Sequence, residues 1–97
     1  MTKFEKPSLD ECKELVHRVE GKTVEEMIAM FGPPVIEHGR RIDERLADGA
    51  PWVIEIRREL MFHDVGPTVH RLVVTERMDG KFEFSMQGRV IADETAV

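Results

Sequence analysis

The sequence predicts an α+β fold in which two N-terminal helices pack on one face of a three- to four-stranded antiparallel meander sheet, a two-layer sandwich. Apolar residues recur with the 3.6-residue period of a helix before about Pro51 and with a period of two, typical of strands, after it. Only Gly21 and Lys22 separate the two helical segments, so both apolar stripes must face one common surface. The 97 residues provide one domain, 1–97, with residues 1–7 and 92–97 expected to be a flexible lead-in and tail.

The first helix is expected from about Leu9 to Glu20. Ser8 and Glu11 have the spacing of a capping box, in which each side chain accepts a hydrogen bond from the other residue's amide. Gly21 ends the helix. The apolar stripe consists of Leu9, Cys12, Leu15, Val16 and Val19, and the residues between them, including Glu11, are expected to face water.

The second helix lies within Gly21–Pro34, which reads GKTVEEMIAMFGPP. Thr23 and Glu26 form another capping box. Gly32 supplies the left-handed residue that ends the helix, and the two prolines after it cannot donate the hydrogen bonds that a longer helix would need. Its apolar stripe is Val24, Met27, Ile28 and Phe31.

The segment between the helices and the long strands is the least regular part of the chain. Val35–Glu37 is expected to form a short strand or an extended segment. Ile42–Leu46 fits either a loop or a helical turn, and both interpretations stay open. Asp48-Gly49-Ala50-Pro51 is a turn in both of them.

Three strands follow this segment. The first runs from Trp52 to Phe62 and is expected to turn one apolar face toward the helices, formed by Trp52, Ile54, Ile56, Leu60 and Phe62 and interrupted only by Arg58. The second is expected at Thr68–Arg77 and the third at Lys81–Gln87. After Gly88, the residues Arg89-Val90-Ile91 either resume the third strand beyond a bulge or form an edge.

The pairing of these strands can be predicted from the faces that each register brings together. A two-residue loop at Asp79-Gly80 would place Glu76 opposite Glu83, whereas a three-residue loop, Met78-Asp79-Gly80, avoids that repulsion. The longer loop, with a left-handed glycine, pairs Val74 with Phe84 and Leu72 with Met86. The same test on the preceding hairpin pairs Leu60 with Val74, Phe62 with Leu72, and Arg58 with Glu76.

The second helix and the strands after it resemble the BamE/SmpA-OmlA family and the β-lactamase inhibitory protein. In that family the helix is typically Gly-x-Thr/Ser-x-x-Glu-hydrophobic-hydrophobic-x-x-hydrophobic-Gly-x-Pro. The matching residues are Gly21, Thr23, Glu26, Met27, Ile28, Phe31, Gly32 and Pro34. The resemblance implies a two-layer sandwich that binds other proteins and is not an enzyme. Because the chain has no lipobox cysteine near its start, it does not imply a membrane anchor.

The charge balance disfavours two classes of partner. Lys and Arg number 14 against 19 Asp and Glu, and the net charge of -5 repels nucleic-acid phosphates and anionic lipids. No apolar run approaches the ~20 residues that span a bilayer. The N-terminal residues carry charges where a signal peptide is apolar, so a cytoplasmic protein without nucleic-acid or membrane partners is expected.

Residues suited to catalysis or metal binding are few. Cys12 is the sole cysteine and lies on an apolar helix face, which favours a buried, unreactive thiol. His63, Asp64 and His70 flank the first hairpin turn and form a weak alternative metal site. His38, with Arg40 and Arg41 nearby, is a weak alternative site for an anionic ligand. No catalytic residue and no cofactor are predicted.

The outer face of the sheet is the better candidate for a binding site. Strand alternation places Arg57, Met61, Val73 and Arg77 there, with Met61 opposite Val73 and the arginines at the rim. We expect this patch to contact another protein or a second copy of the chain. The C-terminal Glu94-Thr95-Ala96-Val97 also fits the Thr-x-Val pattern that PDZ domains bind, although an ordinary tail is the favoured interpretation.

Overall fold

The structure is a computed structural model that describes residues 2–93. Its elements are, in chain order, β1 (Thr2–Phe4), α1 (Leu9–Val19), α2 (Val24–Phe31), β2 (Ile36–His38), β3 (Arg41–Ala47), β4 (Ala50–His63), β5 (Arg71–Arg77), β6 (Phe82–Gln87) and β7 (Val90–Asp93). The predicted α+β class with an antiparallel sheet is confirmed. The C-terminal tetrapeptide considered for PDZ binding lies outside the described residues.

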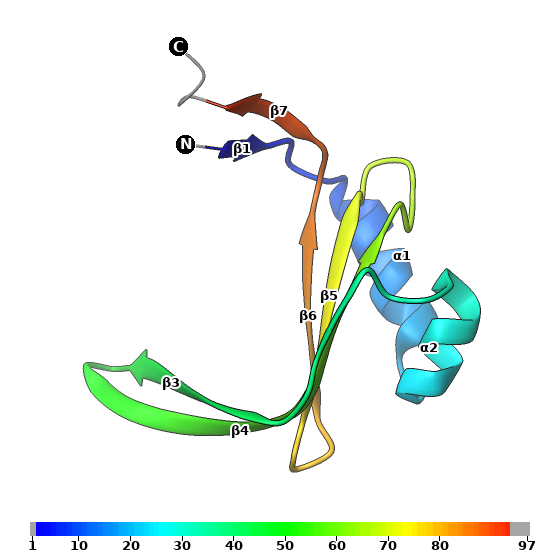
Figure 1. The fold of residues 1–97 in the computed structure, drawn as a ribbon. Helices are drawn as coiled ribbons and strands as arrows, with labels where there is room; N and C mark the ends of the chain where they lie inside the picture. Colours follow the sequence, from blue (N-terminus) through cyan, green and yellow to red (C-terminus); the bar gives the residue numbers. More distant parts are fainter. Residues whose placement is uncertain (1, 94–97) are drawn as a thin grey trace.

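The strands form two sheets, and all of their described pairings are antiparallel. The larger sheet has the order β2-β4-β5-β6, with β3 paired to β4 off this path, and β1 pairs with β7 in a separate ribbon. Figure 1 shows α1 and α2 on one side of β4, β5 and β6, whereas the β3–β4 hairpin and the β1–β7 ribbon project from the other side. We call the projecting hairpin, residues 41–56, the arm.

The capping box predicted for α2 is present. The Thr23 hydroxyl accepts from the Glu26 amide, and the Glu26 carboxylate accepts from the Thr23 amide, both at 3.1 Å. Hydrogen bonds to Thr23 also lower the pKa of Glu26. Gly32 ends the helix with φ 84°, a conformation that a side chain would strain.

The N-terminus of α1 is capped differently from the prediction. Ser8 accepts a hydrogen bond from the Glu11 amide, but the Glu11 carboxylate turns away to the loop before β5. There it accepts from the amides of Thr68, at 3.0 Å, and Val69, at 3.1 Å, and from the Thr68 hydroxyl. The expectation that Glu11 faces only water is therefore wrong, because its carboxylate joins α1 to the sheet.

One buried cluster contains residues of both helices and of the central strands. Its members are Leu15, Val19, Val24, Met27, Leu60, Phe62, Val69, Leu72 and Val74. Half-buried residues of β6, namely Phe82, Phe84 and Met86, lie at its margin. The helices therefore cover β4 and β5 more completely than they cover β6.

The predicted register of both hairpins is confirmed. Leu60 lies opposite Val74, Phe62 opposite Leu72 and Arg58 opposite Glu76, while Val74 lies opposite Phe84 and Leu72 opposite Met86. Gly80 has φ 86°, as the three-residue loop requires. The second strand is shorter than predicted and begins at Arg71.

The long strand β4 departs from the prediction at a β-bulge between Ile56 and Arg58. Opposed residues of an antiparallel pair share a face, and Ile56 lies opposite Arg77, two positions beyond Thr75 on the face away from the helices. Ile54 and Ile56 are buried but lie outside the core cluster. The prediction that they face the helices is wrong, because one extra residue reverses the alternation.

Both interpretations of Ile42–Leu46 are also wrong, since this segment belongs to β3. Asp48 and Gly49 alone connect β3 to β4, and both have positive φ, 53° and 77°. Such a turn matches the twist of a hairpin. Ala50 and Pro51, expected in the turn, are the first residues of β4.

The lead-in, residues 1–7, contains a strand that the sequence did not predict. Phe4 lies opposite Val90, and the Glu5 amide donates to the Arg89 carbonyl at 2.7 Å. A Cβ on Gly88 would lie 2.3 Å from the Glu5 carbonyl oxygen, so the close approach of the two backbones requires glycine. Residues 90–93 thus do not resume β6. They form an edge strand, as one of the two predicted alternatives had it, and the strand beside them is the start of the chain.

Removing the Phe62 ring tests the core. Phe62 is 1% exposed and contacts Phe31 of α2, with ring centroids 5.4 Å apart. Phe62→Ala should lower the free energy of unfolding by ~3–5 kcal/mol, measured by urea denaturation. Leu46→Ala, at a position 79% exposed, should change it by no more than ~0.5 kcal/mol. Equal effects of the two substitutions would contradict the assigned core.

The Glu11 anchor predicts a specific pH dependence. Chiefly the hydrogen bond from the Thr68 hydroxyl, with further bonds from the Thr68 and Val69 amides, lowers the pKa of Glu11 below 4.5 despite some desolvation. The folded state therefore binds the proton more weakly than the unfolded state, and this stabilisation is present above that value and lost as pH falls through the folded-state pKa.

Glu11→Gln should accordingly lower the urea midpoint at pH 7, and its difference from the wild type should shrink as the pH falls below 4.5. Glu14→Gln, on the same helix, is the control and should follow the wild type. A difference that is constant with pH would show that Glu11 does not act through its charge.

Candidate functional site

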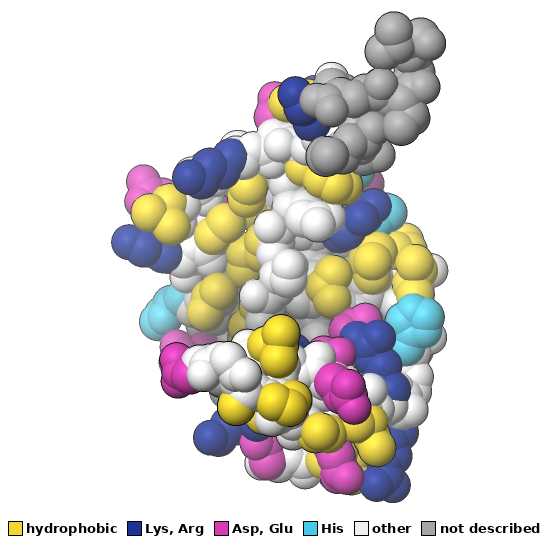
Figure 2. Space-filling model, turned by 90° about the vertical axis from the view of Figure 1, so that its left-hand side faces the viewer, with side chains coloured by type: hydrophobic (Ala, Val, Ile, Leu, Met, Phe, Trp, Pro, Cys, Tyr) yellow, Lys and Arg dark blue, Asp and Glu magenta, His cyan; other side chains and the backbone are white. Residues whose placement is uncertain are grey.

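The sheet face away from the helices, here called the outer sheet face, is open between the arm and the β1–β7 ribbon. Its residues alternate with the core residues of β4, β5 and β6 and include Glu59, Met61, Val73, Thr75, Arg77, Glu83 and Ser85. Figure 2 looks onto this side of the molecule and shows hydrophobic side chains above the arm, with charged side chains around them.

The structure brings three of the four predicted binding residues onto this face. Met61 lies opposite Val73, as predicted, and both are half-buried. Arg77 shares their face, but its guanidinium lies 2.9 Å from Asp79 and 3.7 Å from Glu83. Arg77, one of the two arginines predicted at the rim, is therefore already paired with acidic groups of its own chain.

Arg57 is placed differently because it is the extra residue of the bulge. It is exposed, and it forms no ion pair with any residue in the part of the chain that the structure describes. Its charge is therefore available to an acidic group of another molecule at the junction between the arm and the rest of β4.

Two arginines of β3 hold the arm against the outer sheet face. The Arg45 guanidinium bonds both carboxylate oxygens of Glu83, at 3.0 and 2.8 Å, and contacts Asp43 at 3.3 Å. Arg41 bonds Glu59 at 2.7 Å, and Glu59 also accepts from the Thr75 hydroxyl at 3.2 Å. Ile54 and Ile56 share the face of the arm that carries these arginines, and both are buried.

The hydrogen bonds from Arg45 to Glu83 raise the pKa of Arg45 above its ordinary value, against the opposing effect of burial, and Asp43 adds to the rise. A two-pronged contact of this kind fixes the orientation of both groups. Sequence reasoning missed the contact because β3 was not predicted as a strand. The available signal was the Asp48-Gly49 pair, a common two-residue hairpin turn.

The residues of the weak alternative sites are only partly brought together. His63 and His70 stack with ring centroids 5.4 Å apart, and the His70 Nδ1 lies 2.8 Å from an Asp64 oxygen. The His63 Nε2 atom is buried and has no hydrogen-bond partner among residues 2–93. Within residues 2–93, no three or more His, Cys, Asp or Glu side chains are arranged to hold a metal ion.

The site suggested around His38 is also divided. His38 is the last residue of β2, and the Arg41 guanidinium is bonded to Glu59 on the outer sheet face. Arg40 is exposed in the link between β2 and β3. The structure shows no contact that joins these side chains around a common point.

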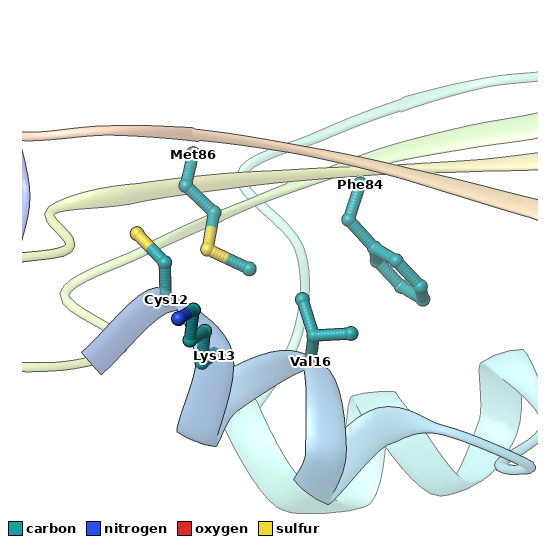
Figure 3. Close-up of a pocket in the computed structure, with 5 residues that line it drawn as sticks. All are labelled: Cys12, Lys13, Val16, Phe84 and Met86. Carbon is teal, nitrogen blue, oxygen red and sulfur yellow. The ribbon is translucent and has the colours of Figure 1, made fainter. Parts of the chain in front are cut away.

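An apolar groove between α1 and β6 was not predicted. It has a volume of about 420 Å³ and is lined by Cys12, Lys13, Val16, Phe84 and Met86. Figure 3 shows the side chains of Phe84 and Met86 extending from β6 toward those of α1. Cys12, expected to be buried, is half-buried in the wall of this groove.

Comparison with known proteins finds no match among protein-family models, curated proteins or solved structures. Within the described residues, neither helix has the length and apolar character needed to cross a bilayer.

Arg45→Ala tests how the arm is held. Loss of the contact with Glu83 should speed amide hydrogen exchange in residues 41–56, measured by NMR or mass spectrometry. The global free energy of unfolding should fall by only ~0.2–1 kcal/mol, because both groups remain partly exposed. Arg40→Ala, at an exposed arginine outside this contact, is the control. Unchanged exchange in the arm would show that Arg45 does not hold it.

Proposed function

We propose that this chain is a non-catalytic protein-interaction module, a two-layer sandwich that binds its partner through the outer sheet face. The observation that carries this proposal is the half-buried pair Met61 and Val73, directly opposed on a face that the helices leave open. The arm borders this face on one side and the β1–β7 ribbon on the other (Figure 1). Apolar residues at the centre of a surface with charged residues at its rim are typical of protein interfaces.

The exposed charge of Arg57 favours a partner segment that carries acidic residues. It is exposed and free of internal ion pairs among residues 2–93, whereas Arg41, Arg45 and Arg77 are each bonded to carboxylates. A carboxylate on the partner would therefore add a charge pair without first breaking one. The resemblance to the BamE/SmpA-OmlA family supports the same class of function, since members of that family bind other proteins.

A ligand or metal site on the loops, around His38 or His63 and His70, is the weaker candidate. In its favour, the imidazoles of His63 and His70 stack beside Asp64. Against it, Asp64 and His70 already bond each other, and the His63 Nε2 is closed to solvent. The outer sheet face, in contrast, presents an apolar pair, Met61 and Val73, that neither helix covers (Figure 1).

Met61→Glu tests the proposal. A charge at the centre of the interface should reduce partner capture by about tenfold or more, because it must be desolvated on binding. The measurement is quantitative co-precipitation from a lysate of the native source, with the wild-type chain and Leu46→Glu as matched baits. Leu46 is 79% exposed on the arm, so the control carries the same charge outside the predicted interface.

The Met61→Glu variant should keep the circular dichroism spectrum of the wild type, and its melting temperature should lie within a few degrees of the wild-type value. Capture that Met61→Glu leaves unchanged, or that Leu46→Glu reduces equally, would refute the outer sheet face as the binding site.

A further inference from the structure

The β6 strand is the last strand of the larger sheet, so one of its edges has no neighbouring strand among the residues that the structure describes. On its other edge, the carbonyls of Lys81 and Gln87 accept from the amides of Arg77, at 2.8 Å, and His70, at 2.9 Å. Backbone groups alternate between the two edges of a strand. The N–H and C=O groups of Phe82, Phe84 and Met86 therefore point to the free edge.

The side chains beside this edge are apolar and incompletely covered. Phe82 and Phe84 stack with centroids 6.2 Å apart, and Phe84 and Met86 line the α1–β6 groove. Val16 lies on the apolar stripe of α1 yet is 38% exposed. The strand FEFSMQ contains no proline and places no charge on its helix-facing side, so it lacks features that commonly protect a free edge.

The same strand is complementary to itself. In an antiparallel pair related by a two-fold axis at Phe84, that residue lies opposite Phe84 of the second copy, and Phe82 lies opposite Met86. Glu83 then lies opposite Ser85. If the second copy were shifted by two residues, so that its Phe84 lay opposite Phe82, the two Glu83 carboxylates would oppose each other. The register centred on Phe84 brings apolar groups together and avoids that repulsion.

We propose that a second copy of this chain pairs with β6 in this register, forming a continuous sheet and filling the α1–β6 groove of each copy with apolar side chains of the other. A two-fold pairing covers both free edges and both grooves at once, which a single peptide strand cannot do. The proposal concerns a different surface from the outer sheet face and does not rest on the function proposed for that face.

Sedimentation equilibrium of the full chain tests the proposal. The wild type should approach twice the chain mass of 11.2 kDa as concentration rises. Val16→Glu places a charge in the groove and should weaken self-association by at least tenfold. Val53→Glu is the matched control, because it makes the same change at a position 57% exposed on the arm, and it should associate like the wild type.

A measurement on the wild type alone makes the test independent of the variants. Amide exchange by NMR, at concentrations below and above the association range, should show added protection at Phe82, Phe84 and Met86 and no change in the arm. The amides of Glu83 and Ser85 already face β5 and serve as internal references.

A chain that stays monomeric to ~1 mM would overturn the proposal, since that limit leaves at most about 4 kcal/mol for association. A dimer that Val16→Glu leaves intact, or that Val53→Glu disrupts, would also overturn it and assign self-association to another surface. Loss of the dimer in Met61→Glu would assign it to the outer sheet face. Retention of the dimer in that variant together with loss of partner capture would separate the two surfaces.

Discussion

The β-bulge at Arg57 determines the form of this molecule. Without it, strand alternation would place Ile54 and Ile56 on the same face of β4 as Leu60 and Phe62, toward the helices. The extra residue divides β4 into a half that carries Leu60 and Phe62 toward the helices and a half that carries Ile54 and Ile56 the other way. The apolar residues of the second half are buried on the outer side, where Arg45 of the arm bonds Glu83 of β6.

Arg58, the residue after the bulge, joins β4 to both α2 and β2. Arg58 interrupts the helix-facing side of β4 and bonds Glu25 of α2 at 3.0 Å and Glu37 of β2 at 2.9 Å. Burial alone would lower the pKa of Arg58, but hydrogen bonds to these two carboxylates raise it above its ordinary value. Glu76, which lies opposite Arg58 in the register, is not its ion-pair partner, because α2 offers a carboxylate on the side to which the guanidinium turns.

Features fixed by neighbouring residues could be predicted, and features fixed by distant ones could not. The Thr23 cap, the Gly32 stop and the Gly80 turn each depend on a few adjacent residues, and the register of β5 and β6 follows from their alternating faces. The position of the bulge depends on which residues of β4 are buried by parts of the chain that are distant in sequence. The β3 strand is held to the sheet by charged residues such as Arg45, which bonds Glu83. It therefore lacks a buried apolar face, which is the feature by which strands are usually recognised in a sequence. Within the candidate site, Met61 and Val73 were therefore placed correctly, whereas Arg57 lies at the break in the alternation.

The unequal cover of the sheet links the two proposed surfaces. Both helices lie on one side of the sheet (Figure 1) and cover β4 and β5 more completely than β6, so apolar area is left at β6 and on the outer sheet face. An antiparallel pairing of β6 edges has its two-fold axis roughly perpendicular to the sheet, so the helices of both copies would lie on one side and both outer faces on the other. Such a dimer would present two identical binding faces in the same direction. A partner with two matching segments would then bind the second at a high effective concentration, which strengthens a modest single interface without any new contact.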